Sequence, residues 1–318
     1  SDLHGTAIAI ISSSFLLLYY ILTHQYQYSY VWNYSSSDLP LHLLISTFYA
    51  GQEGSFTLWT LYTTIIGIVL LGYSSRKGWE VEVMFVFNLV LGFLITMLVI
   101  KNPFEYIWDV FPNDLIHTGT LPHEGVNFVW LDQAKGIWAQ YPSEGKGLNP
   151  LLQNYWMAIH PQVLFSGFSA MSVPYIFAVA ALLKREYQSW VKVAKPWTVF
   201  GATMLGTGII LGGYWAYETL GWGGYWGWDP VENSSLVPWL VALASVHTMM
   251  SAQCPNIPWL ISLLTRVNTF GILNKNSYTS DPYTISNPLI RRYLYLSFGI
   301  LTILVIVSYF RSEEHTSE

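Results

Sequence analysis

Long apolar runs recur along the chain, and they constrain its fold more than any other sequence feature. A helix that crosses the ~30 Å hydrocarbon core of a bilayer needs about 20 mainly apolar residues. Only 10% of the 318 residues are charged, against about 25% in soluble domains. We therefore predict an all-α fold, a polytopic bundle of about eight membrane helices. The predicted spans are 5–23, 56–73, 83–101, 163–184, 197–216, 236–253, 257–273 and 293–310.

Basic residues in short loops indicate which ends of the spans face the cytoplasm. Four of them lie in 184–195 and two in 74–82, which fall on one side of the predicted bundle. The opposite side then receives the outer loops of a single membrane domain, residues 1–310, although Arg291 and Arg292 lie there against the rule. We expect the longest outer loop to fold as a small cap. The outer loops are 24–55, 102–162, 217–235 and 274–292.

Both ends of the chain have the character of cut ends. The first residues, SDLHG, lack a Met and enter an apolar run almost at once. The last eight, RSEEHTSE (311–318), follow an apolar run abruptly and read as a translated sequencing adapter, with a natural polar tail as the alternative. The single cysteine, Cys254, excludes an internal disulfide and a CxxCH haem-attachment site.

The segment GWGGYWGWDPVENSS (221–235) combines four glycines, three tryptophans and a tyrosine with no Lys or Arg. Glycine lets the backbone approach a flat partner closely, and each indole offers a wide apolar face and one N–H donor. A planar macrocycle needs both properties. An aromatic belt at the membrane interface is the alternative, but the interleaved glycines and the absent basic residues favour a ligand platform.

A helix is predicted to begin in the second half of that segment. Asp229 suits a helix cap, Pro230 the first turn, and Glu232 the positive end of the helix dipole. We expect the two carboxylates to order the loop rather than to act as acid or base.

Two histidines have positions that suit a ligand. His247 lies about 16 Å below Leu236 at 1.5 Å per residue, near mid-membrane, where a polar side chain is costly and marks function. Imidazole is a common haem ligand, although a bond to a neighbouring helix is equally open. His160 precedes Pro161, which tends to begin helices and to break them from inside, so His160 is predicted at a helix entrance on the face of the Trp-rich segment. Its alternative is a surface histidine.

Other polar residues are weaker candidates for a functional site. Arg266, in the seventh predicted span, either snorkels to the interface or meets a carboxylate such as a haem propionate. His24, His42, His117 and His123 fall in outer loops, where solvation is the ordinary state. Hydrolase and nucleotide-binding motifs of the GxSxG, HExxH, P-loop and GxGxxG types do not occur.

WGGYWGWDPVEN resembles the tryptophan-rich "WWD" signature of haem-handling proteins in cytochrome c biogenesis. Three further stretches, at 30–59, 102–104 and 147–161, resemble the CcmF/NrfE-type cytochrome c haem lyases. The similarity covers nearly all of 1–310 and corresponds to about the first half of a full-length family member. The signature residues are Trp222, Gly223, Gly224, Trp226, Trp228 and Asp229, followed by Pro230, Glu232 and Asn233.

The resemblance implies a multi-pass protein of the bacterial inner membrane with its WWD loop on the periplasmic side. That loop would hold haem delivered by a CcmE-like chaperone, with His160 as an outer iron ligand and His247 as a ligand of a buried haem b. The family joins haem to the CxxCH thiols of apocytochrome c with a CcmH-like thiol-reductase partner. The lone cysteine agrees, because the thiols come from the substrate.

One position departs from the family pattern. The second outer histidine of the family would fall near Asn274, but 266–282 contains no histidine. The outer haem would then be ligated on one side, by another loop histidine, or not at all. Three other classes therefore remain: a CcmC/CcsA-like haem transport or delivery protein, a quinol:haem oxidoreductase without lyase activity, and a structural membrane subunit.

Overall fold

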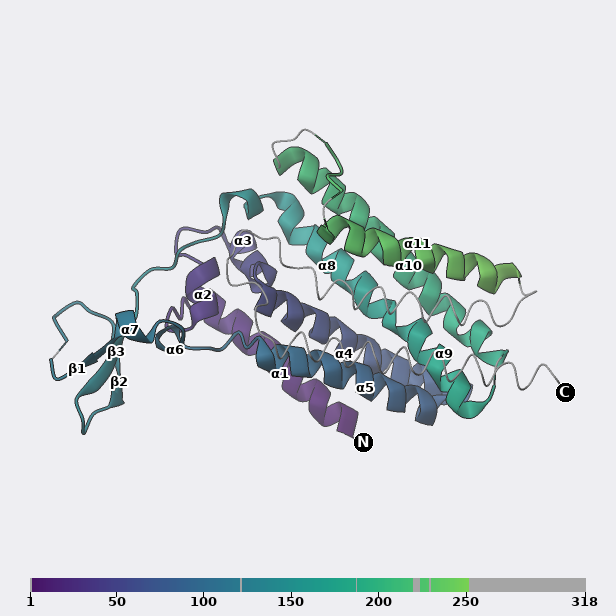
Figure 1. Ribbon diagram of the computed structural model, residues 1–318, viewed down its shortest axis with the longest axis horizontal. Helices are drawn as coiled ribbons and strands as arrows, with labels where there is room; N and C mark the ends of the chain where they lie inside the picture. Colours follow the sequence, from purple (N-terminus) through teal and green to yellow (C-terminus); the bar gives the residue numbers. More distant parts are fainter. Residues whose placement is uncertain (1, 121, 187, 220–223, 229, 252–318) are drawn as a thin grey trace. The chain divides into compact units, whose positions relative to one another are not determined.

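The computed structural model describes residues 2–120, 122–186, 188–219, 224–228 and 230–251 (Figure 1). The chain divides into two compact units. Unit 1 comprises 1–61 and 94–159, and unit 2 comprises 62–93 and 160–318. Three long helices continue from one unit into the other: α4 (Gln52–Lys77), α5 (Glu80–Ile100) and α8 (Tyr155–Ala170).

Five helical segments of the described chain are long and apolar enough to cross a membrane. They are Leu3–Leu22 within α1 (Asp2–Leu22), α4, α5, Tyr155–Lys184 and α10 (Ser189–Thr219). These segments coincide with the first five predicted spans. The sixth predicted span falls in α11 (Pro230–Ser251), which is helical but is not among the five. The last two predicted spans, the loop 274–292, Arg266 and Asn274 lie outside the described residues.

The fourth membrane segment consists of two helices, α8 and α9 (Ser172–Lys184), which meet at Met171. Pro174 has no N–H to donate to the carbonyl of Ala170, so the helical hydrogen-bond ladder is interrupted at this junction. Met171 stays in right-handed helical geometry, with φ −65° and ψ −13°, and its N–H still bonds to the Gly167 carbonyl at 2.9 Å. The segment therefore continues as one element across the junction.

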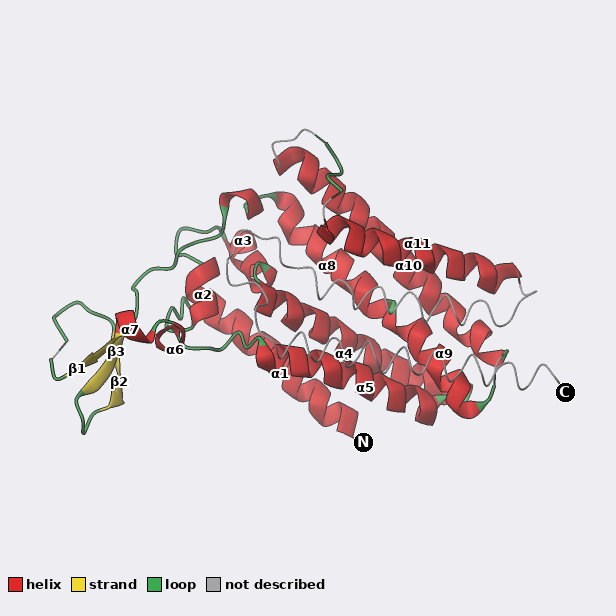
Figure 2. Ribbon diagram, in the orientation of Figure 1, coloured by secondary structure: helices red, strands yellow, loops and turns green. Residues whose placement is uncertain are grey.

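The long outer loop contains a small sheet, which the predicted all-α fold did not include (Figure 2). Strands β1 (Ile116–Thr118), β2 (Phe128–Asp132) and β3 (Ile137–Gln140) pair antiparallel in the order β1-β3-β2. Strands of three to five residues are too short to show a clear sequence period, although their β-branched and aromatic residues suit a pleated surface. The predicted cap is therefore built in part from strands.

Short helices surround the sheet and the outer ends of the long helices in unit 1. They are α2 (Ser29–Tyr34), α3 (Leu41–Ser46), η1 (Thr47–Tyr49), α6 (Ile107–Val110), α7 (Pro112–Leu115) and η2 (Pro150–Leu152).

Four parallel rings form a continuous stack in unit 1, which we call the tyrosine–tryptophan stack. Tyr20 stacks on Tyr28 with centroids 4.4 Å apart, Tyr28 on Tyr106 at 5.2 Å, and Tyr106 on Trp108 at 4.6 Å. Backbone bonds join the same segments, since Ser29 N donates to Glu105 O at 2.8 Å. Burial and side-chain bonds to Tyr20 and Tyr106 raise the pKa of Tyr28. These rings are therefore packed and bonded to one another.

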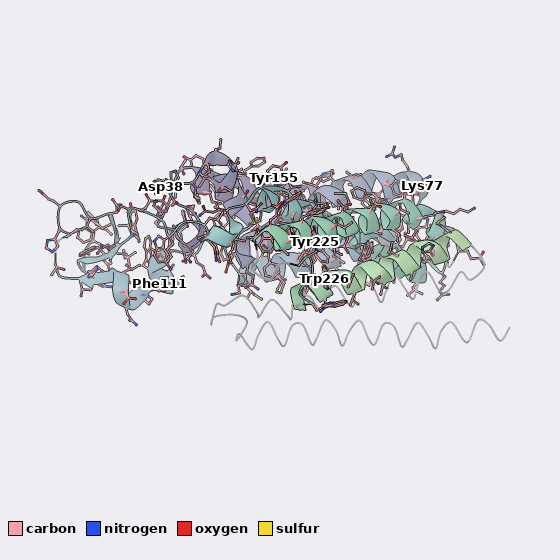
Figure 3. The ribbon with its side chains drawn as sticks, turned by 90° about the horizontal axis from the view of Figure 1, so that it is seen from above. Asp38, Lys77, Phe111, Tyr155, Tyr225 and Trp226 are labelled. Atoms are coloured by element: carbon pink, nitrogen blue, oxygen red, sulfur yellow. The ribbon has the colours of Figure 1, made fainter. Side chains whose placement is uncertain are left out.

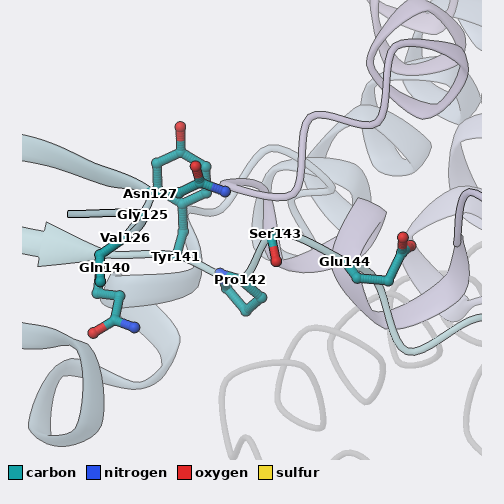
Figure 4. A pocket seen from close by; sticks show the side chains of 8 residues that line it. All are labelled: Gly125, Val126, Asn127, Gln140, Tyr141, Pro142, Ser143 and Glu144. Atoms are coloured by element: carbon teal, nitrogen blue, oxygen red, sulfur yellow. The ribbon is translucent and has the colours of Figure 1, made fainter. Parts of the chain in front are cut away.

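A carboxylate joins two outer loops of unit 1. Glu144 accepts hydrogen bonds from Ser37 N at 2.9 Å, from the Ser37 hydroxyl, from Tyr26 Oη at 2.8 Å and from Gly145 N at 3.0 Å. These bonds lower the pKa of Glu144 to about 2, those from Ser37 most strongly. Figure 4 shows Glu144 at one end of an open pocket that extends along Pro142 and Tyr141 toward the sheet.

In unit 2, helices α10 and α11 pack against each other. Trp239 Nε1 donates to the Ala202 carbonyl at 3.0 Å, and Thr198 Oγ1, one turn earlier in α10, contacts Met249 Sδ at 3.5 Å. Gly206 makes the close approach possible, because a Cβ there would lie 2.4 Å from Trp239 Nε1. Small residues at helix interfaces are typical of membrane bundles.

Candidate functional site

The described part of the Trp-rich loop, 224–228, folds against the last turns of α10. The ring of Tyr225 stacks on Tyr217, with centroids 4.5 Å apart and planes 9° apart, and meets Tyr214 edge-on at 5.6 Å. Tyr225 is nevertheless 53% exposed and Trp228 is 71% exposed. The loop therefore presents aromatic surface rather than burying it.

Contacts from α11 hold the loop backbone in place. The Glu232 carboxylate accepts from Gly227 N, at 3.1 Å to Oε1 and 2.9 Å to Oε2, and Asn233 Nδ2 donates to Trp228 O at 3.0 Å. Trp228 adopts φ +56°, a left-handed conformation that is uncommon outside glycine. Helix α11 begins at Pro230, as the DPVEN pattern predicts. Glu232 thus makes an ordering contact of the kind expected from the sequence.

His160 lies inside a helix, so its predicted place at a helix entrance is wrong. Helix α8 begins at Tyr155 and continues through Pro161 to Ala170. The proline ring removes one backbone donor, but a single lost bond is tolerated in a packed membrane helix. The consequence is that the side chain of His160 is fixed by the helix and its neighbours rather than by a loop.

One ring nitrogen of His160 has a backbone partner. Nδ1 lies 2.8 Å from the Gly208 carbonyl, and because a carbonyl only accepts, Nδ1 carries the proton. The neutral ring then has its lone pair on Nε2, and Gly208 O is the one hydrogen-bond partner of the ring among the described residues. Metal-binding histidines are commonly oriented in this way, by a bond from the other ring nitrogen to a backbone carbonyl.

A row of close contacts places α10 against α8. A Cβ on Gly208 would lie 2.7 Å from Leu164 Cα, one on Gly167 would lie 2.5 Å from Leu205 N, and one on Gly212 would lie 2.7 Å from His160 Cε1. The His160 ring therefore occupies the space that any side chain at position 212 would need. The next residue, Gly213, touches the loop, since its Cβ would lie 3.1 Å from Tyr225 O.

The consecutive residues Gly212 and Gly213 thus bring together His160 and the aromatic loop, which are far apart in sequence. Figure 3 labels Tyr225 and Trp226 beside the start of α11. Two indole nitrogens in this region, Nε1 of Trp226 and Nε1 of Trp215, are buried without a hydrogen-bond partner among the described residues. Buried donors of this kind lose free energy unless a ligand, a water or another group bonds to them.

The remaining predicted site residues are placed in part. Gly224, Trp226, Trp228, Glu232 and Asn233 gather at the loop and the start of α11, and Pro230 begins that helix. Trp222, Gly223 and Asp229 lie outside the described residues. His247 is in α11 with an exposed side chain, about 16 Å along the helix from Leu236. Its role as ligand of a buried haem stays a prediction.

Sequence reasoning missed the residues of α10 that build the site: Gly208, Gly212, Gly213, Tyr214 and Tyr217. The signal was the run GGYWAY (212–217) at the end of the fifth predicted span, where paired glycines precede clustered rings. In the described residues, no group of three or more His, Cys, Asp or Glu is arranged to hold a metal ion. A porphyrin iron needs only axial ligands, so a single well-oriented imidazole suits it.

Comparison with known proteins identifies the class. The profile of the family described as "Cytochrome C assembly protein" matches residues 49–274, more than half of the chain. The chain therefore belongs to the cytochrome c assembly protein family.

Within the family, the chain is a homologue of the CcmF and NrfE proteins. It is 34% identical to the cytochrome c-type biogenesis protein CcmF of Pseudomonas fluorescens over 286 residues, which are 84% of the chain and 38% of that protein. The identity is 32% to Escherichia coli CcmF (75% of the chain, 33% of the relative) and 30% to Haemophilus influenzae NrfE (75% and 33%). The chain thus spans about a third to two fifths of the length of these relatives.

A solved structure agrees. The cytochrome c haem lyase CcmF superposes with a TM-score of 0.68 at 27% identity, over 95% of this chain and 44% of that one. The apolar helices and this homology together indicate a multi-pass membrane protein.

Proposed function

We propose that this chain binds haem at the site formed by His160 and the Trp-rich loop, and that it takes part in the covalent attachment of haem to the CxxCH thiols of apocytochrome c. The observation that carries the proposal is the Gly212–Gly213 pair, which places the oriented imidazole and the aromatic loop on consecutive residues of one helix. The homologues are named as cytochrome c-type biogenesis proteins and the matching solved structure as a cytochrome c haem lyase, which supports a role in this process.

Each residue of the site has a proposed role that follows from its side-chain chemistry. Nε2 of His160 would hold the iron, because Gly208 O keeps the proton of the ring on Nδ1. Tyr225 and Trp228 supply exposed rings for the porphyrin face, and Glu232 keeps their loop ordered. When bound, haem supplies the vinyl groups that react with thiols. The chain holds and orients it, and positioning is the main source of rate in such a reaction.

We propose the surrounding system from the family resemblance. The protein resides in the bacterial inner membrane with the Trp-rich loop on the periplasmic side. It receives haem from a CcmE-like chaperone and works with a CcmH-like thiol reductase. His247 would hold a second, membrane-embedded haem b.

Substitution of His160 tests the proposal. His160→Ala should remove the Soret absorbance of haem held at the outer site in the purified protein and abolish cytochrome c production in cells. His123→Ala, a loop histidine of unit 1, is the matched control and should change neither readout. Full cytochrome c output from the His160 variant would refute the assigned role.

The membrane haem has a separate test. His247→Ala should bleach a b-type absorbance band and leave the His160-dependent Soret signal in place. An unchanged spectrum would exclude His247 as an iron ligand.

A haem transport or delivery function is the second candidate. It is favoured by the exposed platform and by the absence of a histidine from 266–282, where the resemblance to the family places a second outer histidine near Asn274. Haem binding without conversion of an apocytochrome CxxCH peptide to a thioether product would select this alternative over attachment.

A further inference from the structure

Trp215 lies outside the Trp-rich signature but occupies the helix face that holds His160. Along α10, residues 205, 208 and 212 contact α8 at Gly167, Leu164 and His160, and residue 201 contacts Met171 just after α8. Their spacing alternates between four and three residues, which keeps them on one face of the helix. Position 215 is the next member of that series. It follows Gly212 by three residues, about one helical turn farther toward the loop.

The indole N–H of Trp215 has no hydrogen-bond acceptor among the described residues. Its nitrogen, Nε1, is buried. An indole N–H can only donate, and leaving a buried donor unpaired costs about 1–3 kcal/mol. The site therefore lacks an acceptor at this point, one turn of helix from the imidazole.

Other tryptophans of unit 2 show that this state is not general. Trp239 Nε1, also turned toward α10, donates to the Ala202 carbonyl at 3.0 Å. Trp197 lies 18 residues before Trp215, which is five helical turns and hence the same face of α10. Its indole is not among the unpartnered buried nitrogens of the described chain. The unpaired donor on this face belongs to the residue three positions beyond Gly212, which contacts His160.

We propose that Trp215 donates its indole N–H to a carboxylate of the porphyrin that His160 ligates, and so sets the rotation of the macrocycle about the iron–imidazole bond. The inference rests on the proposed function and deepens it. A haem carries two propionates on one edge, and they are its strong hydrogen-bond acceptors.

Such a bond would fix the orientation of the porphyrin in the site. An indole bonded to one propionate fixes that edge toward α10, so the opposite edge faces away from the helix. Trp215 is therefore a positioning residue, which acts through the orientation of the ligand and not on the reacting atoms.

Paired ligands test the inference on the full chain in detergent micelles. Haem and haem dimethyl ester differ in the charge and acceptor strength of the propionate groups, while the iron and the ring faces are the same. The unmodified chain should bind haem about tenfold more tightly than the ester in Soret titrations, because a charge-assisted bond is stronger than a neutral one. Trp215→Phe, which keeps a ring and removes the donor, should reduce that preference to within twofold. Trp197→Phe should keep it.

A second measurement does not depend on a variant. In ultraviolet resonance Raman spectra of the unmodified chain, haem should move an indole N–H band to its hydrogen-bonded position, and the dimethyl ester should move it less. Failure to bind either porphyrin would overturn the proposed function itself. Equal affinity for the two, a preference that survives in Trp215→Phe, or an unchanged indole band would overturn the role of Trp215 and leave the proposed function standing.

Discussion

Each unit contains a cluster of aromatic rings, and the two clusters differ in what surrounds the rings. In unit 1, Tyr20, Tyr28, Tyr106 and Trp108 stack in sequence, and backbone bonds join the segments that carry them. In unit 2, Tyr225 and Trp228 are more than half exposed. The indole nitrogens of Trp215 and Trp226 have no partner among the described residues.

Under the proposed function, this difference separates structural rings from rings that bind the ligand. Rings that satisfy one another contribute to stability, with each aromatic pair adding about 0.5–1.5 kcal/mol beyond its buried area. Rings and donors that remain exposed or unpaired contribute little to the fold and are available to a ligand. Substitutions in unit 1 should therefore change stability, and substitutions in unit 2 should change haem affinity.

The largest expected effect is on affinity, at Gly212. Gly212→Val places atoms where the His160 ring lies, since even a Cβ would be 2.7 Å from Cε1. The imidazole must leave its position, and we expect haem affinity to fall by about 100-fold, the upper range for loss of ligand orientation. Soret titration measures it. Gly72→Val in α4, where a Cβ meets nothing within 4 Å, is the control, and equal affinities in the two variants would contradict the site.

The next effect is on stability, at Tyr28. Tyr28→Leu removes the ring that stacks on both Tyr20 and Tyr106. The free energy of unfolding should fall by about 1–3 kcal/mol, two aromatic contacts at 0.5–1.5 kcal/mol each, as followed by chemical denaturation in micelles. Haem affinity should stay within twofold. A large loss of haem binding here would break the division between the two clusters.

Tyr225→Leu should have the opposite effects to Tyr28→Leu, a small change in stability and a large change in haem affinity. The Tyr225 ring stacks on Tyr217 but is mostly exposed, so unfolding should change by less than about 0.5 kcal/mol. Haem affinity should fall by about tenfold, because one face of the platform is lost. The comparison would be sharpened by measuring both variants in both assays, and it would fail if Tyr225→Leu destabilised the protein as much as Tyr28→Leu.

The smallest expected effect is a loss of stability at low pH, at Glu144. The four hydrogen bonds that Glu144 accepts depress its folded pKa to about 2, below the ordinary value of 4.5. The stability it adds is therefore present above pH 4.5 and is lost as the pH falls from about 4.5 toward 2. Because Glu144 is exposed, the loss should be modest.

Amide hydrogen exchange of residues 35–37 and 144–147 measures how much stability the Glu144 carboxylate adds. Protection should decline over that pH window in the unmodified chain and should already be low and nearly pH-independent in Glu144→Gln. Glu124→Gln, at another exposed glutamate of the cap, should keep the pH dependence. Identical exchange profiles for the two variants would rule out the carboxylate as the joining group.

The membrane helices could be predicted from the sequence because apolar length determines them. The first five predicted spans overlap the five apolar helices, although α4 begins at Gln52, α8 at Tyr155 and α10 at Ser189, several residues before the predicted starts. The first turn of α4 is polar, and a polar residue followed by proline lies between the first turns of α8 and α10 and the predicted starts of their spans. The sheet was missed for the related reason that three to five residues give no clear period.

The candidate site was predictable in its parts but not in its assembly. The Trp-rich loop stands out by composition, and His160 by its position in the stretch 147–161 that resembles the family. The contact of His160 with Gly212 and the bond to Gly208 O depend on how α8 packs against α10, and no local pattern encodes that packing. Pro161 led to the wrong prediction of a helix start for the same reason. A proline inside a helix loses one backbone hydrogen bond, and the packing of α8 against its neighbours compensates for that loss.

The ring of His160 and the missing side chain of Gly212 occupy the same space. Position 212 can then gain a side chain only where position 160 has lost its imidazole or moved it. A lineage that replaces the histidine releases position 212 to accept larger residues, and one that enlarges position 212 loses the use of its histidine. Homologues should therefore show glycine at 212 wherever histidine occurs at 160, and free variation at 212 where it does not. The two positions would be inherited as one character, even though 51 residues separate them in the chain.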